Sequence, residues 1–174
     1  MIATWTKYTG AVLRQGDIVV DCDIAVVPDD FSSDSSDTVI NVEKRRLIVI
    51  TQSCDLENSK APNVALCPVS TIAEFQGLHS NFATLPKIEE IRRSKVEGFY
   101  MLPSPEEPLN NMDAMIVDFR MIVSLPIGYI SRRATVAGER SRLLYPYVEH
   151  FSQAFARFFK RVGLPSQIPP FKSK

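Results

Sequence analysis

The chain has 174 residues, of which 45% are hydrophobic and 23% are charged, and its formal net charge at pH 7 is zero. This length suits one domain with a core of its own, and the composition excludes disordered and collagen-like proteins. No apolar run approaches the roughly 18 residues that cross a bilayer, and the first residues lack the pattern of a signal peptide, so we expect a cytoplasmic protein without a membrane segment.

Charge is unevenly distributed along the chain. Residues 1–60 hold ten acidic and six basic side chains, whereas residues 131–174 hold two acidic and nine basic ones. A basic end suits a nucleic-acid surface, and it suits equally well pairing with the acidic part of the same chain. Both interpretations stay open.

The first half of the chain predicts three strands. Residues 15–17 are a turn signal, and residues 16–27 are rich in β-branched side chains. The apolar run in residues 46–51 is typical of a strand covered on both faces, and residues 64–69 form its return strand in a long-loop hairpin. Residues 28–38, between the first two strands, are polar and acidic, and we expect them to form an exposed loop.

Two short helices are predicted after the third strand. Thr71 and Glu74 are three positions apart, as in a capping box, which predicts a helix over residues 72–79. A proline in the first turn and Gly98 as a left-handed stop predict a second helix over residues 86–96.

The second half predicts two more strands and a C-terminal helix. Residues 98–103 are expected to form a strand, and residues 114–130 a long one, because apolar side chains alternate through residues 115–125. Over residues 147–162 apolar side chains recur every three or four positions, which is typical of an amphipathic helix. We interpret its aromatic stripe as a face that packs on the core.

These elements indicate one mainly β domain of the α+β class, with helices inserted between strands. Short strands, one long strand and a capping helix favour a small, strongly curved sheet or barrel. No repeat or linker divides residues 1–174 into two domains.

Three N-terminal segments resemble the PemK/MazF family: GDIVVDCD at residues 16–23, RRLIVI at residues 45–50 and VALCPVST at residues 64–71. Members of this family are SH3-like barrels, and many are bacterial toxins that cut single-stranded RNA. The resemblance implies such a barrel, a setting in toxin–antitoxin or phage-defence systems, and homodimers. It places the family's catalytic arginine on Arg45 and its strand-end hydroxyl on Ser70.

The same residues have a structural interpretation. Arg45 and Arg46 also suit the solvated start of a strand, and Arg46 stands where the family usually has proline. Ser70 also suits a helix cap beside Thr71. The acidic residues within 29–37 replace a loop of the family and would repel RNA phosphates.

Two hypotheses of function follow. The first is an RNA-binding protein or metal-independent endoribonuclease without a cofactor, in which Arg45 stabilises charge on phosphorus and a base is still needed; the only histidines are His79 and His150. The second is a non-catalytic interaction module on the same barrel, which docks a protein partner such as an antitoxin or a complex subunit.

The segment after the second strand is a further candidate binding site, with Thr51, Gln52, Cys54 and Asp55. A nucleophilic Cys54 needs a nearby base or positive charge, whereas Asp55 disfavours a thiolate. We interpret the segment as an Asx-type turn at the rim of the barrel. No metal site is expected, because the cysteines and histidines lack a ligand spacing.

Two charged groups in the second half complete the candidates. Asp118 and Arg120 lie two apart on one face of the predicted long strand, where they could pair with each other, pair across the sheet or position a phosphate. Residues 132–142 are the strongest basic run. We expect a solvated hairpin tip there, with Arg132 and Arg133 as candidate contacts to nucleic acid or to an acidic protein.

Overall fold

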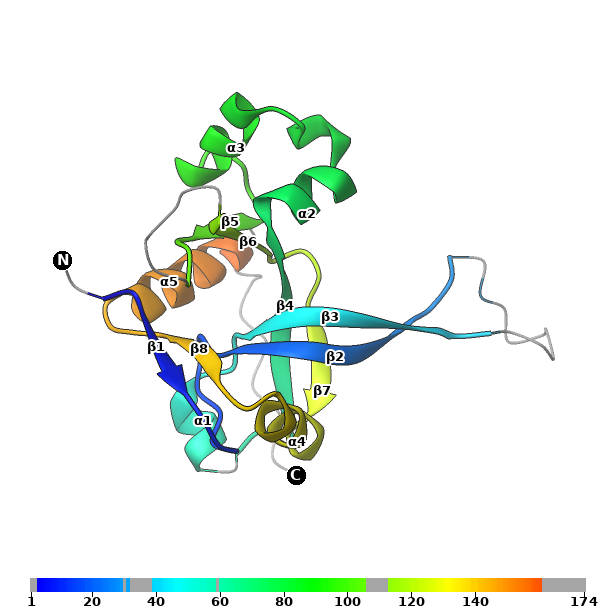
Figure 1. The fold of residues 1–174 in the computed structure, drawn as a ribbon, viewed down its shortest axis with the longest axis vertical. Helices are drawn as coiled ribbons and strands as arrows, with labels where there is room; N and C mark the ends of the chain where they lie inside the picture. Colours follow the sequence, from blue (N-terminus) through cyan, green and yellow to red (C-terminus); the bar gives the residue numbers. More distant parts are fainter. Residues whose placement is uncertain (1–2, 30, 32–38, 59, 106–112, 161–174) are drawn as a thin grey trace, which may run out of the picture.

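A computed structural model describes residues 3–29, 31, 39–58, 60–105 and 113–160 (Figure 1). These residues form a mixed α+β fold whose eight strands pair antiparallel. The strands are β1 (Trp5–Tyr8), β2 (Ile18–Val26), β3 (Asn41–Val49), β4 (Asn63–Thr71), β5 (Phe99–Leu102), β6 (Met115–Asp118), β7 (Val123–Pro126) and β8 (Arg140–Leu143). The helices are α1 (Ser53–Glu57), α2 (Ile72–Leu78), α3 (Leu85–Arg92), α4 (Ile127–Ala137) and α5 (Tyr147–Phe159), with a 3₁₀ turn η1 (Ser80–Phe82). None of these described helices is both long and apolar enough to span a membrane.

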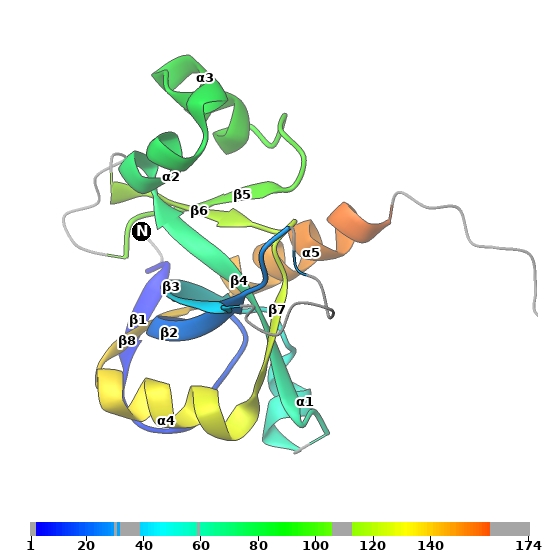
Figure 2. The same ribbon diagram turned by 90° about the vertical axis from the view of Figure 1, so that its right-hand side faces the viewer.

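The main sheet is organised around β4, which pairs with three strands along its length. Residues 63–66 pair with β7, residues 66–68 with β3, and residues 69–71 with β6. β2 continues the sheet beyond β3, and β5 continues it beyond β6 (Figures 1 and 2). The predicted hairpin of the second and third strands is therefore confirmed as β3 and β4.

The single long strand predicted over residues 114–130 is wrong. β6 and β7 pair with successive parts of β4, and residues 119–122 between them leave the ladder. β6 ends at Asp118 because its carboxylate accepts a hydrogen bond from the backbone N–H of Arg120 at 2.9 Å, which fixes a turn. From Ile127 the chain forms α4, where the strand was expected to continue.

A two-stranded ribbon of β1 and β8 joins the main sheet at the start of β2. The backbone N–H of Leu143 donates to the carbonyl oxygen of Gly16 at 3.2 Å. Gly16 has a φ of +83°, and a Cβ on it would lie 2.8 Å from the Cβ of Leu143, so only glycine fits this junction without strain. The hairpin tip predicted over residues 132–142 is wrong, because this stretch contains most of α4 and the start of β8.

A buried ion cluster holds the ribbon in place. The Asp17 carboxylate accepts hydrogen bonds from Arg140 Nε at 2.9 Å and from Arg142 Nε at 2.5 Å. Both guanidiniums also donate to the carbonyl oxygen of Val12. Arg142 lies 3.8 Å from the centre of the Tyr8 ring, a cation–π contact. The cluster therefore ties β8, β1 and the loop before β2 together.

The amphipathic C-terminal helix packs as predicted. In α5, Phe151 is fully buried, and Phe155 lies against Phe119 with ring centres 5.3 Å apart. On the other face of the sheet, Ile130 and Ala134 of α4 are buried against β2, β3 and β4. The two helices thus cover opposite faces of the curved sheet (Figure 2).

The inserted helices begin as predicted, but the second one ends early. The capping box is present: the Glu74 N–H donates to Thr71 Oγ1 at 3.2 Å, and the Thr71 N–H donates to Glu74 Oε2 at 2.7 Å. α3 ends at Arg92 rather than at residue 96, because Ser94 takes a left-handed φ of +54°. Gly98, at φ +85°, therefore belongs to the connection to β5.

The curved sheet is open in the described part of the chain. β1 pairs only with β8, β5 only with β6, and β7 only with β4. These strands leave free edges, so the sheet does not close into a barrel.

Candidate functional site

β3 and β4 separate after Leu47 and Pro68, the last pair of their ladder. Pro68 has no N–H group to donate, which suits the end of a ladder. Beyond this point β3 stays paired with β2, whereas β4 pairs with β6. The gap that opens between them has Arg45 and Arg46 on the β3 side and Ser70 on the β4 side.

This gap is a cavity of about 520 Å³, which we call the first cavity. Arg45, Arg46 and Ser70, which the sequence selects from separate segments, all line it. The remaining lining residues are Val20, Asp21, Lys44, Val69, Glu74, Gly77 and Leu78.

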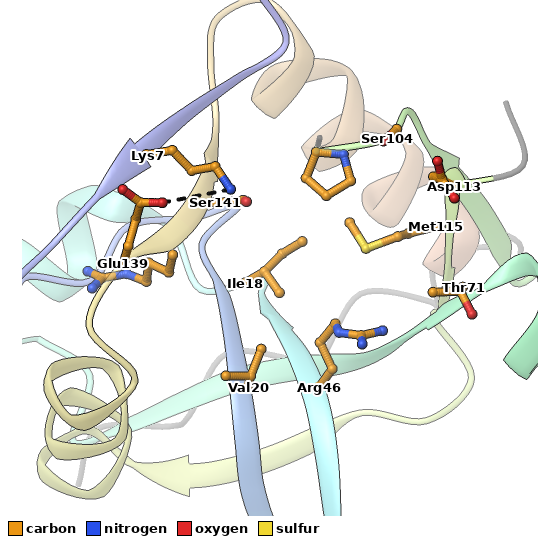
Figure 3. Close-up of a pocket in the computed structure, with 12 residues that line it drawn as sticks. Lys7, Ile18, Val20, Arg46, Thr71, Ser104, Asp113, Met115, Glu139 and Ser141 are labelled. Carbon is orange, nitrogen blue, oxygen red and sulfur yellow. Dashed lines mark ion pairs between the residues drawn. The ribbon is translucent and has the colours of Figure 1, made fainter. Parts of the chain in front are cut away.

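A second cavity of about 390 Å³ adjoins the first, because Val20 and Arg46 line both (Figure 3). The two cavities together form what we call the double cleft. In Figure 3 the β1–β8 ribbon lies on one side of the second cavity, and the ends of β4, β5 and β6 lie on the other. Besides the shared pair, the lining consists of Lys7, Ile18, Thr71, Ser104, Pro105, Asp113, Met115, Glu139, Arg140 and Ser141.

Carboxylates of the chain itself hold the guanidiniums of the first cavity. Arg45 Nη2 donates to Glu43 Oε2, and Arg46 Nη1 donates to Glu74 Oε2 at 3.1 Å. Both arginine side chains are about one-third exposed, so solvent reaches these ion pairs. An incoming anion can therefore replace the carboxylates at a small energetic penalty, because exposed ion pairs are weak.

Glu74 links the cap of α2 to the double cleft. Partial burial raises the pKa of its carboxyl, but the hydrogen bond from the Thr71 backbone and the charge of Arg46 outweigh it and lower the pKa overall. Glu74 therefore stays ionised at neutral pH and keeps Arg46 directed towards the end of β4.

Buried positive charge lies behind the second cavity. Arg140, which lines it, and Arg142 share the single carboxylate of Asp17, which leaves one positive charge in excess. The carboxylate also raises the pKa of the Arg142 guanidinium through its hydrogen bonds. This buried charge and the Lys7–Glu139 ion pair, 4.0 Å long, give the second cavity a polar, partly cationic wall.

No histidine among the described residues lines the double cleft. His79 follows α2 and packs among aromatic rings, with its centre 4.5 Å from that of Phe75. His150 lies on α5, beside the Tyr147 ring. The structure therefore brings cations and hydroxyl groups together without an imidazole base.

The Thr51–Asp55 candidates do not belong to the double cleft. Their segment forms the short helix α1 in place of the predicted Asx-type turn. Thr51 Oγ1 accepts the backbone N–H of Ala65 at 2.7 Å, which fastens the end of β3 to β4. Gln52 and Cys54 are exposed, and the Cys54 sulfur lies 3.7 Å from Gln52 Oε1 and 3.9 Å from Asp55 Oδ1. The contacts of the Cys54 sulfur are thus an amide oxygen and a carboxylate oxygen rather than a basic side chain.

Asp118 and Arg120 pair with each other outside the double cleft. Arg120 Nε and Nη2 donate to the two carboxylate oxygens of Asp118 at 2.9 and 2.7 Å. The guanidinium of Arg120 lies 4.1 Å from the centre of the Phe99 ring. The sequence left three possibilities open: pairing with each other, pairing across the sheet, or binding of a phosphate. The structure shows that Asp118 and Arg120 pair with each other.

Arg132 and Arg133 lie on α4 rather than on a hairpin. Arg132 is exposed, whereas Arg133 lies over β2 with its guanidinium 4.0 Å from the Asp21 carboxylate. Because Asp21 lines the first cavity, Arg133 borders the site without lining it.

Sequence reasoning missed the part of the double cleft that comes from the ribbon and from the ends of β5 and β6. The missed polar residues of that part are Lys7, Ser104, Asp113, Glu139, Arg140 and Ser141, and Lys44 of β3 was missed as well. Lys44 directly precedes Arg45 and Arg46, and this run of three basic residues was the one local indication that it belongs to the site. The others come together only through the pairing of β1 with β8 and of β5 with β6.

Comparisons with known proteins add no further assignment. No protein-family model matches the chain, and no curated protein matches it either. Among the described residues, no group of three or more histidine, cysteine, aspartate or glutamate side chains is placed to hold a metal ion.

Proposed function

We propose that the chain binds single-stranded RNA in the double cleft, as a PemK/MazF-like protein of a bacterial toxin or phage-defence system. The observation that carries this proposal is that Arg45 and Ser70, 25 positions apart, line the same cavity. Lys44 and Arg46 line it as well, so three consecutive basic residues share this cavity with Ser70.

The strand arrangement supports an opened form of the SH3-like barrel. The ribbon of β1 and β8 meets β2 through the bridge between Asp17 and Arg142, and β2, β3 and β4 follow as neighbours. Small β-barrels commonly bind ligands at their mouths. The double cleft lies where β3 and β4 separate.

The proposed chemistry is exchange of anions at Arg45 and Arg46. RNA phosphates would take the places of the Glu43 and Glu74 carboxylates, with Ser70 as a hydroxyl donor to a phosphate or a 2′-oxygen. The second cavity would hold the adjacent nucleotide against its partly cationic wall. The described lining offers carboxylates but no imidazole as a base, so binding is tested first and cleavage second.

The direct test is fluorescence anisotropy with a labelled single-stranded RNA, for the wild type, Arg45→Ala and Arg46→Ala. We expect weaker binding by both variants, and a salt dependence shallower by about 0.7 in log–log slope for each phosphate that the variant no longer binds. Arg93→Ala is the matched control, because Arg93 is exposed and pairs with Glu89 on α3. An absence of RNA binding by the wild type at low salt, or an equal loss in Arg93→Ala, ends this proposal.

Cleavage is tested by expression of wild type and Arg45→Ala in bacteria. A toxin of this class arrests growth and degrades cellular RNA, and the variant relieves both effects. If the wild type binds RNA in the first test but leaves growth and RNA intact, the protein is an RNA-binding protein without nuclease activity.

A second candidate function is a non-catalytic interaction module that is accessory to a larger bacterial system. The pairing of Arg45 with Glu43 and of Arg46 with Glu74 favours it, because these guanidiniums already bind carboxylates such as those of an acidic partner protein. This candidate predicts no RNA binding and no growth arrest. It also predicts that Arg46→Glu releases a protein that co-purifies with the wild type.

A further inference from the structure

The C-terminal end of α5 and the turn before β5 enclose a cavity of about 330 Å³, which we call the aromatic cavity. Two left-handed residues shape this turn, Ser94 at φ +54° and Gly98 at φ +85°, and both line the cavity. Figure 2 shows α5 beside the segment that returns from α3 to β5. No described residue lines both the aromatic cavity and the double cleft, so the two are separate sites.

Aromatic rings form much of the wall of this cavity. Phe99 and Tyr100 come from β5, Phe119 directly follows β6, and Phe158 comes from α5. The rings of Tyr100 and Phe119 stack with their centres 6.0 Å apart, and the centres of Phe119 and Phe158 are 6.2 Å apart. Tyr100 and Phe158 are only partly buried, so a flat ring that enters the cavity can pack against them. Stacking of bases on aromatic side chains is a common way in which proteins hold single nucleotides.

Two exposed cations, Arg157 and Lys160, also line the cavity from the end of α5. Among the ion pairs of the described residues, neither of them has a carboxylate partner. Burial raises the pKa of the Tyr100 hydroxyl, and the positive charge of Arg157 partly opposes this, so that charge reaches the aromatic wall. Glu97 is the one acidic residue of the described lining, which leaves positive charge in excess.

We infer that the aromatic cavity binds a nucleotide, with its base against the rings of Tyr100 and Phe158 and its phosphate at Arg157 and Lys160. A phosphate monoester carries nearly two negative charges at pH 7, which the two cations match. The volume lies at the lower end of the range for small-molecule sites, so it suits one nucleotide better than a larger ligand. The nucleotide is either a free nucleoside monophosphate or one nucleotide of an RNA chain, because both present a base and a phosphate.

The test is isothermal titration calorimetry of the full chain with adenosine monophosphate (AMP), adenosine and inorganic phosphate. We expect saturable binding of AMP and at least about tenfold weaker binding of adenosine and of phosphate, since each keeps only one part of the contacts. The cation variant, Arg157→Ala with Lys160→Ala, should weaken AMP binding at least about tenfold. Phe158→Leu should weaken it about tenfold, because it removes a ring on which the base stacks.

Arg14→Ala is the matched control, because Arg14 is an exposed arginine outside the cavity that pairs with Glu57. It should bind AMP as the wild type does, and circular dichroism establishes that every variant is folded. A wild type without saturable AMP binding at millimolar concentrations overturns the inference. AMP binding that is unchanged in the cation variant, or weakened equally in Arg14→Ala, overturns it as well.

Labelled single-stranded RNA distinguishes the two sources of the nucleotide. If the ligand is a free nucleotide, the cation variant loses AMP binding but binds the RNA as the wild type does. If the ligand is a nucleotide of the RNA, the cation variant weakens both, and AMP competes with the RNA. Arg45→Ala separates this inference from RNA binding in the double cleft, since it should retain AMP binding. Loss of AMP binding in Arg45→Ala and its retention in the cation variant would assign AMP to the double cleft, which overturns the inference and leaves the proposed function standing.

Discussion

Arg142 donates two hydrogen bonds to Asp17, 125 positions away in the chain, from Nε at 2.5 Å and from Nη2 at 2.8 Å. Arg140 donates a third to the same carboxylate at 2.9 Å. All three side chains are buried. One carboxylate therefore balances two guanidiniums in the interior, and neither arginine has another carboxylate within reach among the ion pairs of the described residues.

Asp17→Asn should lower the free energy of unfolding by about 3–5 kcal/mol, because it leaves two buried guanidiniums without a counter-charge. Urea denaturation followed by circular dichroism measures this loss. Glu149→Gln, at an exposed position on α5, is the control and should change the free energy of unfolding by less than about 0.5 kcal/mol. A loss below about 1 kcal/mol in Asp17→Asn would show that the cluster contributes little to stability.

Gly16→Ala and Gly77→Ala should have opposite effects. A Cβ on Gly16 meets the Cβ of Leu143 at 2.8 Å on a backbone of positive φ, so we expect a loss of about 1–3 kcal/mol. Gly77 lies in α2 with no atom within 4 Å of an added Cβ, so alanine should add about 0.5–1 kcal/mol through helix propensity. Thermal unfolding of the two variants checks both signs.

The capping box should make part of the stability depend on pH. The folded state lowers the pKa of Glu74, so its contribution is present above the unfolded value near 4.3 and is lost as pH falls through the folded pKa. Glu74→Gln should therefore destabilise the protein at pH 7, and its difference from the wild type should shrink as pH falls below about 4. A difference that stays constant between pH 7 and pH 3 would contradict this assignment. Thr71→Ala, which removes the other half of the cap, should cost about 1 kcal/mol.

Cys54 should be the one fast-reacting thiol of the native protein. Burial raises the pKa of Cys22 to about 11, although Arg133 partly opposes it, and burial raises the pKa of Cys67 to about 12. At pH 8 these two thiols are protonated and inaccessible, whereas Cys54 is exposed. Titration with Ellman's reagent should show one rapidly reacting thiol in the native wild type and none in native Cys54→Ser. The wild type unfolded in urea should show three. Rapid reaction of a second thiol in the native protein would refute this prediction.

Local patterns predicted the elements whose stability is local. The apolar run before Thr51 and the capping box at Thr71 identified β3 and the start of α2. The aromatic spacing identified α5, because a helix of this period buries one face. In each case the side chains that carry the pattern are near one another in sequence.

The errors arose where distant contacts outweigh the local pattern. The alternation through residues 115–125 continues past Asp118, but the hydrogen bond from Arg120 to its carboxylate ends the strand. Ile130 and Ala134, four apart, carried a helical signal that the preceding alternation concealed. β8 was missed because Arg140 and Arg142 have the sequence character of solvated residues, and only Asp17 makes their burial favourable.

Only part of the candidate site could be predicted from the sequence, because distant contacts form the rest of it. Arg45 and Ser70 were selected by the resemblance to the PemK/MazF family, with Arg46 as the neighbour of Arg45, and the three residues line one cavity. The second cavity is formed in part by the ribbon of β1 and β8. Nothing in the local sequence indicates that Lys7 on β1 pairs with Ser141 on β8.

The pairing of β1 with β8 also decides which part of the chain can fold independently. The three segments that resemble a known family end at residue 71, yet Asp17 within the first of them depends on arginines made 123 and 125 residues later. A fragment that stops before β8 would leave the Asp17 carboxylate without both of its arginines. The native contacts of the N-terminal segments are therefore complete only once Arg140 and Arg142 are present.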